Sequence, residues 1–145
     1  MGSIFRFEHK ACGFEYKHFD GVGFMGMELE HEAYEKIKKG EMGADWQKLL
    51  ADNPSGKVTV HNELFYCEKC KEYHSIPQIK FYVLNKDASE EDEMFFDPEK
   101  YTLVDKETVY CPKCKEKTVE MDNVYSVPCP VCGKVIKGKM EGLWD

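Results

Sequence analysis

The sequence has no long hydrophobic run. Across its 145 residues, no window approaches the roughly 18 consecutive apolar residues that a membrane-spanning helix needs. Residues 1–10 show no apolar stretch of signal-peptide length after a basic start. We therefore expect no membrane partner and a cytoplasmic location, where thiols stay reduced.

The chain also lacks an excess of positive charge. It contains 20 lysine and arginine residues against 27 aspartate and glutamate residues, and its formal net charge is −7. This balance disfavours a nucleic-acid partner, because binding to nucleic acid depends on neutralising phosphates. Aromatic residues make up 13% of the chain, which excludes an intrinsically disordered protein. We therefore expect a globular protein whose partners are proteins.

The number of cysteines is odd. Seven are present, which excludes a framework in which every cysteine is paired in a disulfide within one chain. Two C-x2-C turns can supply four sulfurs to a tetrahedral metal ion, and in a reduced compartment this use is more typical than crosslinking. Six of the cysteines form three such pairs, Cys67/Cys70, Cys111/Cys114 and Cys129/Cys132.

The last two C-x2-C pairs have a spacing typical of a four-cysteine zinc site. Gly133 follows the last cysteine, at a place where a turn can need a positive φ. Residues 117–120 and 123–127 are β-prone and predict a hairpin that joins the two pairs. We predict a site that holds Zn²⁺, with iron as the alternative metal, and its ligands are Cys111, Cys114, Cys129 and Cys132.

The remaining three cysteines leave a second tetrahedral site one ligand short. His9 precedes Cys12 at the place where a C-x2-C pair would have its first cysteine. Seven cysteines and this histidine supply the eight ligands that two tetrahedral sites need. The other predicted site therefore holds a second Zn²⁺ through His9, Cys12, Cys67 and Cys70.

Three other histidines are alternatives to His9 as the missing ligand. His74 follows Cys70 at a spacing also found in metal sites, and His18 and His61 lie on strands beside the cysteines. Without His9, three thiolates would leave an open position, as in zinc enzymes. With His9, both sites are closed, and the sequence contains no H-E-x-x-H helix and no evident acid–base constellation. We therefore predict a non-catalytic protein with structural metal sites.

The segments between the cysteines predict an α+β fold. Apolar residues recur at helical spacing over residues 27–39 and again over 44–52. Segments of strand-forming composition surround these helices. They cover residues 4–8, 14–19, 58–66 and 76–84.

The order of these segments predicts two zinc-ribbon-like antiparallel modules. Residues 1–84 form the first, a split ribbon that a two-helix insertion interrupts over about residues 20–56. Residues 85–106 carry many acidic side chains and are predicted to form a linker or loop. Residues 107–145 form the C-terminal four-cysteine ribbon.

Both halves resemble zinc ribbons through the paired C-x2-C motifs and the β-prone residues around them. Cys129-Pro130-Val131-Cys132-Gly133 also resembles one half of rubredoxin, an iron electron-transfer protein. The order of the elements is similar to that of small bacterial double zinc-ribbon proteins with no known activity. The resemblance implies a protein-interaction or regulatory module. A nucleic-acid-binding zinc ribbon and a rubredoxin-like electron carrier are the alternatives.

Overall fold

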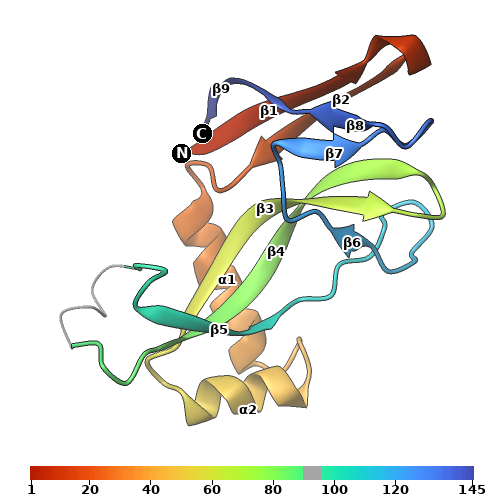
Figure 1. Cartoon of the computed structure of the whole chain (residues 1–145). Coiled ribbons are helices and arrows are strands. Elements are labelled where there is room, and N and C mark those ends of the chain that lie inside the picture. The colour runs from red at the N-terminus through yellow and green to blue at the C-terminus, as the bar shows by residue number, and fades with distance from the viewer. Residues whose placement is uncertain (90–95) are drawn as a thin grey trace. The chain divides into compact units, whose positions relative to one another are not determined.

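The computed structural model describes residues 1–89 and 96–145. Its two α-helices and its antiparallel sheets confirm the predicted α+β class with a helical insertion (Figure 1). The helices are α1 (Gly26–Lys38) and α2 (Ala44–Asp52), with a short 3-10 helix η1 (Lys10–Cys12). The strands are β1 (Gly2–His9), β2 (Phe14–Asp20), β3 (Lys57–Cys67), β4 (Glu72–Leu84), β5 (Tyr101–Lys106), β6 (Val119–Glu120), β7 (Ser126–Pro128), β8 (Val135–Lys137) and β9 (Lys139–Trp144).

The chain divides into two compact units that interleave along the sequence. The first unit comprises Met1–Met25, His61–Gln78 and Thr108–Asp145, and the second comprises Gly26–Val60 and Ile79–Glu107. The predicted modules over residues 1–84 and 107–145 do not coincide with these units, because β3 and β4 each contribute residues to both. Both predicted metal sites fall in the first unit.

In the first unit, β1 lies between β2 and β9 in a three-stranded antiparallel sheet, and β7 pairs with β8. Phe5 and Phe7 of β1 are buried while Arg6 between them is partly exposed, which is the alternation expected of a strand with one face on a core. The core that they enter also contains Leu64, Tyr73, Val127, Cys129 and Ile136.

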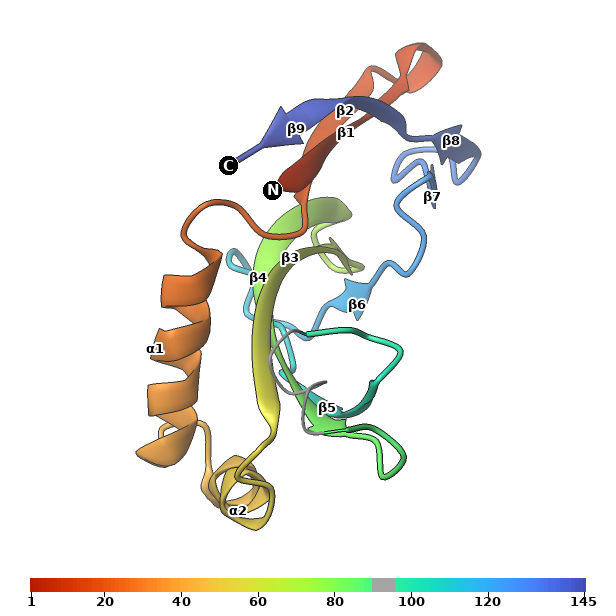
Figure 2. The same ribbon diagram turned by 90° about the vertical axis from the view of Figure 1, so that its left-hand side faces the viewer.

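In the second unit, both helices pack against strands. Figure 2 shows α1 running alongside β3 and β4. Ala33 and Ile37 lie one helical turn apart, and both are buried, which matches the predicted apolar stripe. The shared core consists of Ala33, Ile37, Leu50, Val58, Val60 and Phe81.

The predicted linker over residues 85–106 contains a strand. Tyr101–Lys106 forms β5, which pairs antiparallel with β4 and buries Tyr101. The strand was not predicted, because the many acidic residues before it led us to assign the whole segment to a linker. The residues Tyr101-Thr102-Leu103-Val104 do have strand-forming composition. Residues 90–95, which hold four of the acidic side chains of the predicted linker, lie outside the described residues.

Within the described part of the chain, no helix is both long enough and apolar enough to cross a membrane.

Candidate metal centres

Four ligand pairs, numbered here in chain order, each lie in a tight turn. The first pair, His9 and Cys12, lies between β1 and β2, and the second lies between β3 and β4. The third, Cys111 and Cys114, lies inside an antiparallel bridge between Tyr110 and Lys117. The fourth lies between β7 and β8. Each pair is therefore presented by its own hairpin-like turn.

The residue after each ligand pair adopts a left-handed backbone conformation. The angle φ is 68° at Gly13 and 78° at Gly133, which confirms the predicted positive φ at Gly133. It is 55° at Lys71 and 64° at Lys115. This conformation is unstrained for glycine but costs about 1 kcal/mol or more for a residue with a side chain.

The structure brings the ligand pairs together in a nested order. The first pair lies with the fourth, and the second lies with the third. This corrects the predicted order, which joined the first pair to the second and the third to the fourth. In each cluster, the four ligand atoms lie within 4.8 Å of one another. The histidine–cysteine cluster consists of His9, Cys12, Cys129 and Cys132, and the four-cysteine cluster consists of Cys67, Cys70, Cys111 and Cys114.

Strand pairing accounts for the nested order. The predicted hairpin between residues 117–120 and 123–127 does not form, because β6 pairs with β3. The backbone N–H of Met121 also donates to the carbonyl of Leu64 at 2.8 Å. These contacts hold the third pair beside the second. Val127 of β7 and Ile136 of β8 share the core of β1, which holds the fourth pair beside the first.

Distances between ligand atoms are close to the edges of a tetrahedral metal site. Sγ of Cys67 lies 3.4 Å from Sγ of Cys114, and Sγ of Cys111 lies 3.9 Å from Sγ of Cys70. Sulfur atoms on a tetrahedral Zn²⁺ at ~2.3 Å are about 3.8 Å apart. In the other cluster, the Nδ1 atom of His9 lies 3.5 Å from Sγ of Cys132, against an expected distance of about 3.6 Å. Both clusters could therefore hold a metal ion.

In each of the third and fourth pairs, backbone N–H groups favour the thiolate form of the first cysteine. Hydrogen bonds from the backbone of Cys114 and Lys113 lower the pKa of Cys111 to about 6, against the effect of burial. Burial would raise the pKa of Cys129, but hydrogen bonds from the backbone of Cys132 and Val131 outweigh it and lower the pKa to about 6. Each cluster thus contains a thiol that ionises near neutral pH, and the thiolate is the form that binds metal.

The cysteines that face these thiols hold their protons more strongly. A hydrogen bond with Cys132, together with burial, raises the pKa of Cys12 to about 11. A hydrogen bond with Cys114, together with burial, raises the pKa of Cys70 to about 12. In each cluster, a hydrogen bond therefore links the thiol that keeps its proton to another cysteine of the same cluster.

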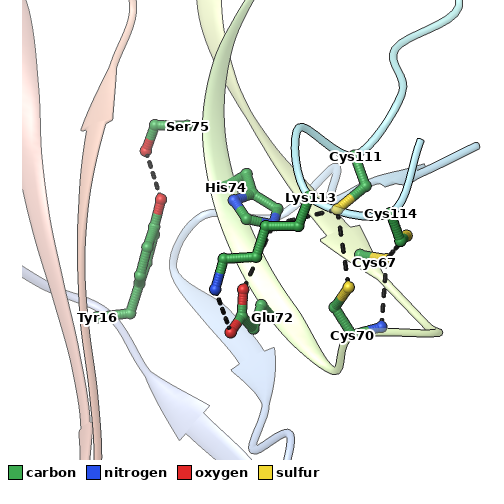
Figure 3. A network of polar contacts seen from close by, with 9 residues as sticks. All are labelled: Tyr16, Cys67, Cys70, Glu72, His74, Ser75, Cys111, Lys113 and Cys114. Carbon is green, nitrogen blue, oxygen red and sulfur yellow. Dashed lines mark hydrogen bonds and ion pairs between the residues drawn. The ribbon is translucent and has the colours of Figure 1, made fainter. Parts of the chain in front are cut away.

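His74, the first alternative ligand, lies at the edge of the four-cysteine cluster (Figure 3). Its Nε2 atom is 3.6 Å from Sγ of Cys111 and 3.8 Å from the Glu72 carboxylate. The ammonium group of Lys113 donates to Glu72 at 2.8 Å, and this hydrogen bond lowers the pKa of the Glu72 carboxyl. His74 therefore contacts a candidate ligand directly, and Glu72 and Lys113 pair beside it, where outer groups could orient a metal-bound thiolate.

His18 and His61 belong to neither cluster. His18 is fully buried, and its Nδ1 atom lies 2.7 Å from Oγ of Ser75 while its Nε2 atom lies 3.0 Å from Oδ1 of Asp20. The hydroxyl of Tyr16 lies 2.9 Å from the same Ser75 oxygen. This network satisfies both nitrogens of the buried imidazole, so His18 needs no metal.

No protein-family model, no curated protein and no solved structure matches this chain. The likeness to zinc ribbons and rubredoxin therefore rests on the ligand pairs alone. Their geometry gives two cysteine-rich clusters that could bind metal ions.

Proposed function

We propose that this chain is a non-catalytic protein that binds two Zn²⁺ ions as structural ions and acts as a protein-interaction module. The observation that carries the proposal is the division of eight candidate ligands into two compact sets of four. Four protein ligands complete a tetrahedral zinc site and leave no position for a substrate. An ion in each cluster would join two turns that lie far apart in the sequence.

The donor sets support zinc as the metal. One histidine with three cysteines is a common ligand set of structural zinc sites. The four-cysteine cluster suits zinc or iron, because ligand type alone does not separate these metals. Elemental analysis of the purified protein should give two zinc ions per chain with no visible absorption. Stoichiometric iron and a red colour would contradict zinc at this cluster and favour electron transfer.

Paired substitutions test which ligands share an ion. Cys12→Ser with Cys129→Ser removes two ligands from one cluster, so this variant should lose one zinc and keep the other. Cys12→Ser with Cys67→Ser removes one ligand from each cluster and should lose both ions to a competing chelator. The ligand order expected from sequence alone predicts the opposite result for the two variants, so zinc content distinguishes the two arrangements.

A further inference from the structure

A cavity of about 760 Å³ lies in the first unit beside the ligand pairs. Its walls come from β2, from Lys71 and the start of β4, and from the turns that carry the third and fourth pairs. The volume falls within the range of about 300–1,000 Å³ that ligand-binding cavities occupy. The cavity was not predicted, because its residues come from four separate segments.

Three aromatic rings line this cavity, together with the apolar side chains of Pro130 and Val131. The rings of Phe14 and Tyr16 lie 6.0 Å and 6.1 Å from the ring of Tyr73, measured between centroids. Tyr73 is only 4% exposed, and its hydroxyl donates to the carbonyl of Pro128, so its ring is held in place. The rings of Phe14 and Tyr16 are partly exposed and suit a further aromatic side chain, which would pack edge to face or offset.

The acidic side chains that line the cavity are matched by cations. Glu72 pairs with Lys113 at 2.8 Å, and Glu15 pairs with Arg6 at 2.7 Å. Lys71 also lines the cavity and is exposed. Among residues 1–89 and 96–145, its ammonium group has no hydrogen-bond or ion-pair partner. The unmatched charge at this cavity is therefore the ammonium group of Lys71.

Lys71 occupies a backbone position at which the first and fourth pairs have glycine. Its φ of 55° is strained for a side-chain-bearing residue. Lys115 has the same position after the third pair, with φ of 64°, but its ammonium group donates to the carbonyl of Pro112 at 3.0 Å. Lys115 does not line the cavity. Lys71 and Lys115 therefore occupy equivalent positions in two turns, but only Lys71 lines the cavity.

We propose that this cavity binds an extended segment of a partner protein in which an aromatic side chain adjoins a carboxylate. The aromatic side chain packs on the partly exposed rings of Phe14 and Tyr16, which rest on the buried ring of Tyr73. The carboxylate pairs with Lys71. This inference rests on the proposed interaction role. A peptide is favoured because β2 is an edge strand of its sheet, and an edge strand can hydrogen-bond an extended chain. The net charge of −7 disfavours a polyanion at the same place.

Titration of the zinc-loaded full chain with the peptide acetyl-Ser-Trp-Glu-Ser-amide, followed by amide NMR, tests the proposal. The shifted resonances should be confined to residues 14–16, 71–74, 113 and 131, which line the cavity. Replacing Glu by Gln in the peptide should weaken binding about fivefold, as expected for one exposed ion pair. Replacing Trp by Ala should abolish measurable binding. An absence of shifts at millimolar peptide, or shifts outside the cavity, would overturn the proposal.

The two lysines supply the matched variants. Lys71→Gly removes the charge and relieves the backbone strain, so it should fold normally and bind the Glu peptide about fivefold more weakly. It should bind the Gln peptide as the parent protein does. Lys115→Gly makes the same change away from the cavity and should leave both affinities unchanged. Equal losses in the two variants, or no loss in Lys71→Gly, would contradict the assignment.

A second probe separates a peptide site from a nucleotide site. Uridine monophosphate combines a planar base with an anion, and tighter binding of this probe than of the Glu peptide would overturn the proposal. Zinc is measured in every sample. Failure of peptide binding with two zinc ions bound therefore counts against this inference and leaves the proposed metal sites standing.

Discussion

At the residue scale, each ligand turn requires a left-handed backbone conformation at the residue that follows the second ligand. Gly13 and Gly133 meet this requirement without a side chain, whereas Lys71 and Lys115 meet it with one. A Cβ atom added at Gly133 would have no neighbour within 4 Å, so only the backbone would oppose a substitution there. The two types of turn therefore differ in backbone energy and not in packing.

Lys115→Gly should stabilise the zinc-loaded protein by about 1 kcal/mol, because it removes left-handed strain at φ of 64°. Gly133→Ala should destabilise it by about the same amount, since it introduces that strain where the added methyl group is free of clashes. Urea denaturation of the two variants measures both changes. A loss of stability in Lys115→Gly would show that the lysine contributes more through its hydrogen bond to Pro112 than it costs.

Substitution of Ser75 should have a larger effect on the free energy of unfolding, because its hydroxyl forms hydrogen bonds with the side chains of Tyr16 and His18. Ser75→Ala leaves Nδ1 of the fully buried His18 without its partner at 2.7 Å. We expect a loss of about 1–3 kcal/mol in the free energy of unfolding, the penalty for an unsatisfied buried polar group. Ser75→Thr keeps the hydroxyl and serves as the control. Equal stability of Ser75→Ala and the parent protein would contradict this role.

At the element scale, the helices and most strands could be predicted, but the partners of the ligand pairs could not. Periodicity is a local property, and the helix predicted over residues 44–52 agrees with α2 to the residue. The C-x2-C pairs resemble one another in sequence, so strand pairing decides which two pairs come together in one cluster. The decisive contacts are those of β6 with β3, and a two-residue strand gives no periodic signal of its own.

The two units differ in what supports them, which gives a prediction at the level of elements. Ile37→Ala removes a fully buried side chain from the contact of α1 with its core, and should cost about 2–5 kcal/mol. Zinc content should stay at two ions, since all eight candidate ligands belong to the first unit. Helix loss by circular dichroism together with elemental analysis checks both statements. Met27→Ala changes a residue that is 86% exposed and is the control.

At the scale of the whole molecule, both candidate metal clusters belong to the first unit and neither belongs to the second. Removal of zinc with a strong chelator at neutral pH should unfold the first unit, because the binding energy of a structural ion is also folding energy. Loss of amide NMR dispersion in residues 1–25, 61–78 and 108–145 measures the change. Re-addition of zinc should restore the spectrum. An unchanged spectrum after complete zinc removal would show that the strands alone maintain the fold.

The nested order of the ligand pairs also leads us to expect an order in which the two clusters assemble. Closing the four-cysteine cluster joins residues 41 apart, Cys70 and Cys111, whereas closing the other joins residues 123 apart, His9 and Cys132. The longer closure costs about 1 kcal/mol more in chain entropy. A growing chain can complete the inner ring once residue 114 has been synthesised, while His9 and Cys12 wait for residue 132. We therefore expect the four-cysteine cluster to close first during synthesis and the cluster that contains His9 and Cys12 to close last.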